Sequence, residues 1–316
     1  MIFEVENRQN WPFESLFRAG RKQEIGAKIR NYVDKPSLLF ISYLPKAIGF
    51  PHFLLYLHAD SFESNMFPQK RGVRCNTTKT MEKKTDAMGR AIADFAKDGR
   101  AGKLRVFSPM FDEDEIPVQV LFRRYDEMPM LERRALDLVK GRMLDVGAGS
   151  GCHSLVLQER GFDVLAIDLS PLAVETMKKR GVKKVREQDF FTLEGQFDTI
   201  LMLMNGIGIV GSLERMNEFF HRLESLLAPG GQLLCDSSDI SYVFENEDGT
   251  IDYPSTDCYF GEVGFRMQYK DTIGEPFSWL YIDFDMLKQK AEENGYEAEM
   301  VAQGEHYDYL ARITKK

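Results

Sequence analysis

A glycine-rich run near the middle of the chain has the residue types of a ligand-binding loop. It covers residues 144–154, Leu-Asp-Val-Gly-Ala-Gly-Ser-Gly-Cys-His-Ser, between a strand-like and a helix-like stretch. Glycines let the backbone approach a ligand closely, and the first N–H groups of a helix can bind an anionic group. The spacing is G-x-G-x-G, whereas the dinucleotide fingerprint G-x-G-x-x-G would need its third small residue at Cys152. The loop therefore predicts an anionic ligand group and disfavours NAD.

Two acids that follow the loop have positions suited to a nucleoside. Asp168 lies 21 residues after Gly147, at the end of the next apolar run, where a carboxylate can accept both hydroxyls of a ribose. Ser170 and Pro171 already supply an N-cap and a first helical residue, so a capping role for Asp168 is the less favoured alternative. Asp189 ends a third run, where it either accepts a hydrogen bond from the amine of a base or is a solvated loop acid.

These residues must be positioned by elements that alternate between strand and helix. Five short runs are almost continuously apolar, as expected of strands buried on both faces of a parallel sheet. They are residues 143–146, 163–167, 185–188, 197–204 and 231–236. A helix is predicted over residues 212–227, where apolar residues recur at helical spacing and Pro229-Gly-Gly then ends the helix. The alternation predicts a doubly wound α/β fold.

Five features of this region resemble, in their order and intervals, the class I S-adenosylmethionine-dependent methyltransferases. They are the glycine run, Asp168, Asp189, residues 197–200 (Phe-Asp-Thr-Ile) and residues 227–231 (Leu-Ala-Pro-Gly-Gly). The likeness is specific over residues 140–240 and looser from Met81 to the C-terminus. It implies a Rossmann-like, mostly parallel seven-stranded sheet whose last strand is antiparallel and inserted beside its neighbour.

The C-terminal part of the chain fits such a sheet. We expect a helix over residues 283–294, followed by a hairpin that residues 296–302 and 307–313 form around Gly304. Residues 277–282 are expected to be either the sixth-strand region or an extra strand.

The resemblance implies an S-adenosylmethionine site made by ten residues. They are Asp145, Gly147, Gly149, Gly151, Asp168, Leu169, Asp189, Phe190, Met204 and Asn205. On this resemblance, Asp145 and the glycine backbone face the methionine part of the cofactor. Asp168 holds the ribose, Leu169 packs on the adenine, and Asp189 and the Phe190 N–H meet the edge of the adenine. Met204 and Asn205 lie beside the cofactor and the transferred methyl group.

A sulfonium methyl is already activated, so the protein must chiefly hold a nucleophile in line with the methyl–sulfur bond. We therefore expect no metal site. Asp239 is the first candidate for the catalytic side of the pocket, as a base or substrate anchor, and its alternative role is to cap a turn. Asn205 is the second candidate. Tyr125 is the third, as an aromatic lid over the cofactor, and its alternative is ordinary helix packing.

The acceptor is expected to be a small molecule rather than a nucleic acid. The formal net charge is −8 and the pI is near 5.4, which argues against a broad basic surface for phosphates. The loop after Asn205 reads Gly-Ile-Gly-Ile-Val-Gly and lacks the Asn/Asp-Pro-Pro-aromatic signature of enzymes of this class that methylate nucleic-acid amines. An acidic insertion over residues 242–269 also disfavours a polyanion.

The remaining features indicate a cytoplasmic protein with an N-terminal extension. Four widely spaced cysteines fit neither a zinc site nor a disulfide framework, and the apolar stretch 36–58 is too interrupted to span a membrane. Residues 1–80 are expected to be a poorly ordered tail or translation from a start upstream of a true Met81, with a small accessory domain as the third alternative. Residues 81–141 are expected to form a helical cap, and residues 142–316 the cofactor-binding domain.

The sequence thus predicts a methyltransferase with S-adenosylmethionine as cofactor and an unidentified small-molecule acceptor. Two alternatives stay open at this point. One is a non-catalytic cofactor-binding or regulatory protein of the same fold, because members share cofactor residues far better than catalytic ones. The other is an NAD(P)-linked oxidoreductase. The oligomeric state cannot be predicted from these patterns.

Overall fold

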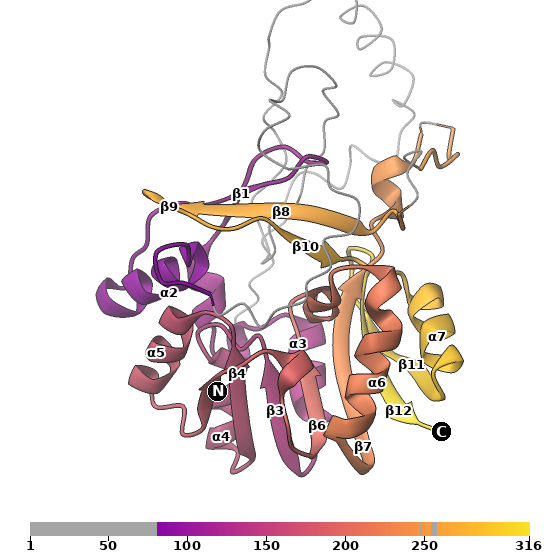
Figure 1. The fold of residues 1–316 in the computed structure, drawn as a ribbon, viewed down its shortest axis with the longest axis horizontal. Coiled ribbons are helices and arrows are strands. Elements are labelled where there is room, and N and C mark those ends of the chain that lie inside the picture. Colours follow the sequence, from indigo (N-terminus) through magenta and orange to yellow (C-terminus); the bar gives the residue numbers. More distant parts are fainter. Residues whose placement is uncertain (1–80, 247, 254–257) are drawn as a thin grey trace, which may run out of the picture. The chain divides into compact units, whose positions relative to one another are not determined.

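The computed structural model describes residues 81–246, 248–253 and 258–316. The expectations for residues 1–80 lie outside this part of the chain. The most extensive feature among the described residues is a mixed sheet with helices on both faces (Figure 1).

The larger sheet has seven strands among the described residues, in the order β11-β12-β7-β6-β3-β4-β5. Their bounds are β3 Arg142–Val146, β4 Asp163–Asp168, β5 Val185–Glu187, β6 Phe197–Met202, β7 Leu227–Ser238, β11 Tyr296–Gln303 and β12 Asp308–Lys315. Neighbouring pairs from β5 to β7 are parallel, whereas β12 is antiparallel to both β7 and β11. The predicted fold class is confirmed, with the last strand inserted beside its neighbour.

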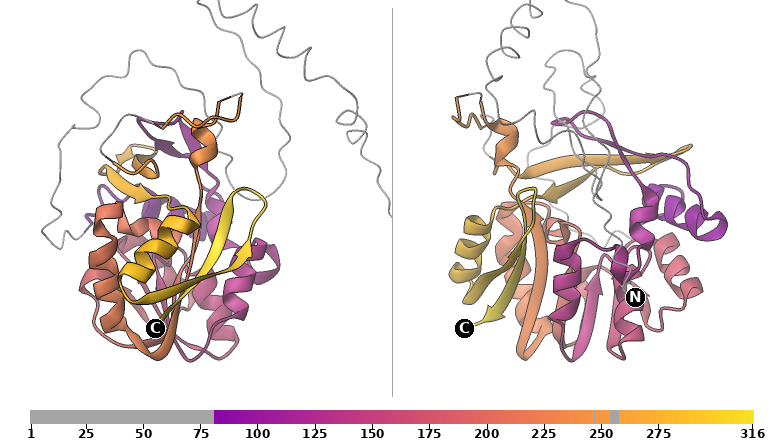
Figure 2. Two further views of the ribbon diagram at one scale, coloured as in Figure 1. Left: turned by 90° about the vertical axis from the view of Figure 1, so that its right-hand side faces the viewer. Right: turned by 180° about the vertical axis from the view of Figure 1, so that it is seen from behind.

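Two helical layers cover this sheet, and Figures 1 and 2 show them from opposite sides. One layer comprises α3 (Met130–Asp137), α4 (Cys152–Glu159) and α5 (Pro171–Arg180), and the other α6 (Met216–Leu226) and α7 (Phe284–Glu293). The helix predicted over residues 212–227 begins instead with the 3-10 turn η5 (Leu213–Arg215), and α6 ends directly in β7. Pro229-Gly-Gly therefore lies inside a strand, where an irregularity in the pairing of β7 with β6 accommodates it.

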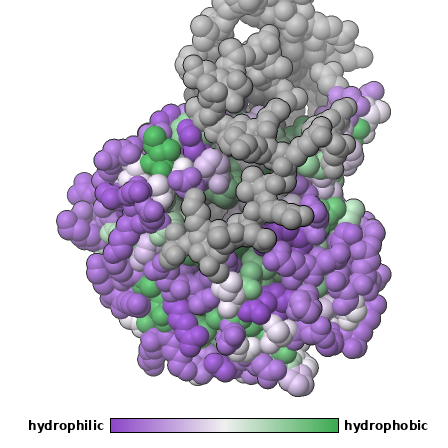
Figure 3. Space-filling view, viewed as in Figure 1, coloured by the Kyte–Doolittle hydropathy of each residue, from purple (hydrophilic) through white to green (hydrophobic). Residues whose placement is uncertain are grey.

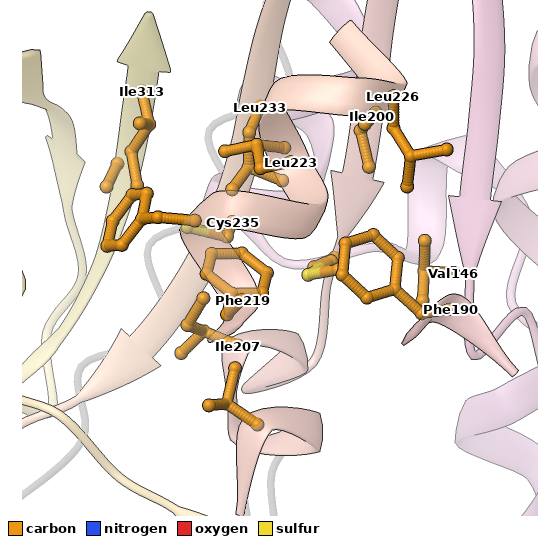
Figure 4. Close-up of a cluster of buried hydrophobic side chains, with 14 of the residues drawn as sticks. Val146, Phe190, Ile200, Ile207, Phe219, Leu223, Leu226, Leu233, Cys235 and Ile313 are labelled. Atoms are coloured by element: carbon orange, nitrogen blue, oxygen red, sulfur yellow. The ribbon is translucent and has the colours of Figure 1, made fainter. Parts of the chain in front are cut away.

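The main core lies between the sheet and α6. The buried side chains of Phe219, Phe220 and Leu223 on α6 pack against strand residues such as Ile200 and Leu233. Figure 4 shows Phe190, from the 3-10 turn η3 (Phe190–Thr192), beside Phe219, with ring centroids 5.5 Å apart. This core carries the strands whose carboxyl ends hold the expected site residues.

A second, smaller sheet was not foreseen as a unit. It comprises β1 (Leu104–Phe107), β2 (Asp114–Ile116), β8 (Glu262–Tyr269), β9 (Thr272–Ile273) and β10 (Phe277–Leu280). Its order is β10-β8-β1-β2, with β9 paired to β8. Residues 277–282 thus hold an extra strand, and β11 takes the place of the sixth strand.

Residues 81–141 are only partly helical. They contain α2 (Ala87–Asp98), η1 (Val118–Phe122), η2 (Tyr125–Glu127) and α3, but also β1 and β2. A boundary at residue 142 therefore divides the smaller sheet between two chain segments. Figure 1 shows this sheet lying across the end of the larger one, and β10 contacts the 3-10 turn η4 (Gly206–Val210) that follows β6.

The face of the molecule seen in Figure 3 is mostly hydrophilic where it is not covered by grey atoms. Among the described residues, no helix is both long and apolar enough to cross a membrane. A last 3-10 turn, η6 (Ser241–Phe244), follows β7.

We predict that Phe219→Ala lowers the free energy of unfolding by about 3–5 kcal/mol, because it leaves a cavity in the fully buried interface between α6 and the sheet. Urea unfolding followed by circular dichroism measures this change. His221→Ala, on the exposed face of the same helix, is the matched control and should stay within about 0.5 kcal/mol. Equal losses in the two variants would contradict the assigned core.

Candidate functional site

The glycine loop between β3 and α4 leaves open space on one side. Gly147 and Gly149 have φ angles of +66° and +56°, which side-chain-bearing residues rarely adopt. A Cβ atom at Gly147 would meet nothing within 4 Å, and one at Gly149 only the Gly147 carbonyl oxygen at 4.0 Å. At Gly151, in contrast, a Cβ would lie 2.9 Å from the Val182 side chain. The first two glycines therefore fit a ligand cradle, and the third permits close packing.

Asp168 stands next to this loop and fixes its backbone. Its carboxylate accepts the Gly149 N–H and the Ser170 N–H, each at 2.8 Å. Each carboxylate oxygen can accept a second hydrogen bond, which is what a pair of ribose hydroxyls would supply. Burial raises the pKa of Asp168 to about 6, although the two N–H groups oppose this shift and the charges of Asp86 and Asp145 add to it.

Asp86 is a site residue that the sequence reasoning missed. It caps α2 through the Gly89 N–H at 2.8 Å, and its other oxygen accepts the Ser170 hydroxyl at 2.6 Å. Because Ser170 caps α5, this buried bond joins the starts of α2 and α5 beside Asp168. The signal was available, since an aspartate directly before an amphipathic run is a typical N-cap.

A buried charged network lies beneath the glycine loop. Glu132 on α3 pairs with the guanidinium of Arg123 at 2.5 Å and with Nε2 of His153 at 2.8 Å. Asp145 lies close by on β3 and accepts the Ser154 hydroxyl at 2.6 Å. Burial would lower the pKa of His153, but the neighbouring Cys152 and Glu132 outweigh it, so this pKa lies well above its ordinary value. Burial raises the pKa of Asp145, which the charge of His153 opposes.

The loop after β6 brings Asn205 to the same edge of the sheet. The Asn205 side-chain oxygen accepts the Ser238 hydroxyl at 2.8 Å, and its backbone carbonyl accepts the indole N–H of Trp279 at 3.1 Å. Trp279 lies on β10 and packs directly on Gly208, where a Cβ would lie 2.0 Å from the indole nitrogen. The two sheets are therefore joined at the residue expected beside the transferred methyl group.

Leu169, Asp189 and Phe190, which are expected to contact the cofactor, follow strands β4 and β5. Leu169 is 37% exposed beside Asp168, as a side chain that covers a ligand ring would be. Asp189 accepts the Phe191 N–H at 2.9 Å and caps η3, while the Phe190 ring is buried in the core. Only the backbone of Phe190 is therefore available for the expected contact.

Tyr125 packs against the ends of two helices. Its hydroxyl lies 2.8 Å from the Asp137 carboxylate, and the Arg160 guanidinium lies 4.3 Å from its ring centroid. Asp137 ends α3 and Arg160 caps the C-terminal end of α4, whereas the glycine loop precedes the start of α4. These are the helix-packing contacts of its alternative role, and the lid role of Tyr125 stays a prediction.

Residues of η1, upstream of Tyr125, contact the glycine loop instead. The Ser150 hydroxyl donates to the carbonyl of Leu121. Arg180 donates to the Ser150 carbonyl at 2.6 Å, and its guanidinium covers the ring of Phe122 at 4.6 Å. The segment before α3 thus reaches the loop through a backbone carbonyl rather than through a tyrosine ring.

Asp239 caps a turn at the end of β7. Its carboxylate accepts the Ser241 N–H at 2.8 Å, which is the alternative role that the sequence left open. It follows Ser238, the residue that contacts Asn205, so it lies at the same strand end.

Comparisons with known proteins identify the family of the chain. Residues 119–300 match the family model described as a methyltransferase domain. A crystal structure of an S-adenosylmethionine-dependent methyltransferase from Bacteroides fragilis, in complex with S-adenosyl-L-homocysteine, is 56% identical in sequence. The alignment covers 75% of this chain and 98% of that one, with a TM-score of 0.71.

More distant relatives add less. The CcbJ methyltransferase from Streptomyces caelestis is 12% identical over 73% of this chain and 98% of its own, with a TM-score of 0.50, which indicates the fold alone. The putative methyltransferase YqeM from Bacillus subtilis (strain 168) is 32% identical over 108 residues, 31% of this chain and 42% of that protein. The chain spans less than half the length of the curated relatives that it matches.

We predict that Glu132→Gln lowers the pKa of His153 by at least about one unit, since it removes a carboxylate 2.8 Å away, and one unit corresponds to roughly 1.4 kcal/mol. A proton NMR titration of the imidazole resonances, assigned with a His153→Gln variant, measures this shift. The resonances of the exposed His221 should be the same in both proteins. An unchanged His153 titration in a folded Glu132→Gln protein would refute the network.

Proposed function

The chain belongs to the class I S-adenosylmethionine-dependent methyltransferases, and on that premise we propose that it moves a methyl group from this cofactor to a small-molecule acceptor. The observation that carries the proposal is the loop of Gly147 and Gly149. The loop has open space beside both glycines, and the Gly149 N–H donates to the Asp168 carboxylate at 2.8 Å. The 56% identical relative contains S-adenosyl-L-homocysteine, the product form of the same cofactor.

We assign the cofactor contacts as follows. The loop backbone and Asp145 face the methionine part, where Ser154 orients the Asp145 carboxylate. Asp168 holds the ribose with the second acceptor site on each of its oxygens. Leu169 covers one face of the adenine, and Asp189 with the Phe190 N–H meets its edge.

When bound, S-adenosylmethionine would supply a methyl group on a sulfonium sulfur: a lone pair of the acceptor would form the new bond to the methyl carbon, and the electrons of the broken C–S bond would stay on the sulfur of S-adenosylhomocysteine. The residues of this chain then hold the acceptor in line and exclude water. Asn205, fixed by Ser238 and Trp279, is proposed to lie on the acceptor side of the methyl group. Asp239 is proposed as an anchor or base at the same strand end.

A small acceptor is supported by the chemistry around this edge. The loop after Asn205 is apolar, and Met267, Phe277 and Trp279 of the smaller sheet are half-buried apolar side chains packed in its hydrophobic cluster. Acids of the 242–253 segment, such as Glu245, disfavour a polyanionic acceptor.

Calorimetric titration of the purified protein with S-adenosylhomocysteine, NAD and NADP tests the cofactor assignment. Micromolar binding of the first ligand alone is expected, and binding of a nicotinamide cofactor alone would overturn the proposal. Transfer of radiolabelled methyl from S-adenosylmethionine to a panel of small acceptors then tests the reaction. Tight binding without transfer to any acceptor would favour a regulatory role.

We predict that Asp168→Ala weakens S-adenosylhomocysteine binding more than tenfold. The change removes the charged acceptor of the ribose hydroxyls, which is worth roughly 1.5–3 kcal/mol. Asp163→Ala is the matched control, because Asp163 begins the same strand at its other end and forms an exposed ion pair with Lys184. Calorimetry should give an unchanged dissociation constant for the control.

Affinity for S-adenosylhomocysteine should also depend on pH. The pKa of Asp168 is about 6 in the free protein, so the carboxylate is ionised at pH 7.5 and mostly protonated at pH 5. Because only the ionised form can accept both hydroxyls, the dissociation constant should rise about tenfold between these pH values. Asp168→Asn should flatten this dependence, and a wild-type affinity that does not change over this range would contradict the assignment.

A further inference from the structure

The loop after β6 adopts a backbone conformation that needs external support. Met204 and Asn205 are consecutive residues with φ angles of +67° and +56°, both in the left-handed region. This region is unfavourable for residues with a side chain, and for methionine more than for asparagine. The chain therefore must contain groups that hold these two residues in place.

Asp236, near the end of β7, supplies this support. One carboxylate oxygen accepts the Met204 N–H at 3.0 Å, and the other accepts the Gly206 N–H at 3.0 Å. The two bonds bracket Asn205 from both sides. The residue is only 6% exposed, so water cannot readily replace the carboxylate.

Asn205 is held by three further contacts once the loop has this shape. Its side-chain oxygen accepts the Ser238 hydroxyl, and its backbone carbonyl accepts both the Gly208 N–H at 3.0 Å and the indole N–H of Trp279. These bonds require the loop geometry that Asp236 imposes.

We propose that Asp236 is the positioning residue of the acceptor side, holding Met204 and Asn205 in the left-handed conformation that aligns the acceptor with the methyl group. The inference rests on the proposed methyl transfer. Asp236 lies three residues before Asp239 in the chain. It would act through the loop backbone and need not contact the substrate itself.

An ionised carboxylate suits this task better than its amide. Each of its oxygens accepts, whereas asparagine would place its NH₂ group against one of the two backbone N–H donors. Burial raises the pKa of Asp236 to about 7, an effect increased by the charge of Glu132 on α3 and opposed by the loop N–H groups. Glu132 is itself paired with Arg123 and His153.

The test compares the full-length wild type with Asp236→Asn. We expect S-adenosylhomocysteine affinity, measured by calorimetry, to change less than twofold. We expect kcat, measured with the acceptor from the panel that gives the highest turnover, to fall at least tenfold while KM for S-adenosylmethionine stays within twofold. Unchanged kcat, or equal losses in kcat and cofactor affinity, would overturn the proposal.

A rescue experiment separates positioning from general stability. In the Asp236→Asn background, Met204→Gly should restore at least threefold more turnover than Met204→Ala. Both changes remove the methionine side chain, but only glycine adopts a positive φ without strain. Equal turnover in the two double variants would refute the positioning role.

If no acceptor in the panel is methylated, the proposed function fails, and the role of Asp236 is then tested by NMR. The indole ¹⁵N–¹H resonance of Trp279, assigned with a Trp279→Phe variant, reports the bond to the Asn205 carbonyl. Asp236→Asn should shift this resonance in the folded, S-adenosylhomocysteine-bound protein. An identical resonance in both proteins would overturn the proposal independently of activity.

Discussion

Carboxylates that accept backbone N–H groups hold the loops at the carboxyl edge of the larger sheet. Asp168 binds the N–H groups of Gly149 and Ser170, and so joins the glycine loop to the start of α5. Asp236 does the same across Asn205. Backbone donors are strong and obligatory partners, so a buried acid placed among them fixes a loop without a cationic partner. The proposed cofactor site lies beside these fixed loops.

The acids also explain the unusual electrostatics of this edge. Burial raises the pKa values of Asp145, Asp168 and Asp236, and the charges of neighbouring acids add to the shift for the last two. The buried cations Arg123 and His153 both contact Glu132, and of the three acids only the pKa of Asp145 is lowered by the charge of His153. A sulfonium cation entering the site would therefore meet negative charge that the protein has only partly neutralised.

The sequence was sufficient for elements with strong local signals. Apolar runs followed by Gly147 or Asp168 identified strands β3 and β4, and the helix expected over residues 283–294 is α7 (Phe284–Glu293). It failed where a role depends on contacts between distant segments. Glu132 is buried in contact with Arg123 and His153, and its neighbours in the sequence do not indicate this pairing. Likewise, nothing in residues 236–239 distinguishes Asp236, which holds a loop, from Asp239, which caps a turn. The side chain of Tyr125 is oriented by its contacts with Asp137 and Arg160.

The smaller sheet has a consequence for how the protein is made. Its strand β1 pairs with β8, and the partners Leu104 and Tyr269 are 165 residues apart in the chain. During synthesis at 5–20 residues per second, β1 waits roughly ten to thirty seconds for its partner to emerge from the ribosome. Strands β3 to β7 are synthesised before then, so they can associate before the smaller sheet is complete. Closing such a long loop is entropically costly and slow. Among the described strands, the smaller sheet can therefore close only after β3 to β7 have been synthesised, whereas β11 and β12 of the larger sheet emerge last of all.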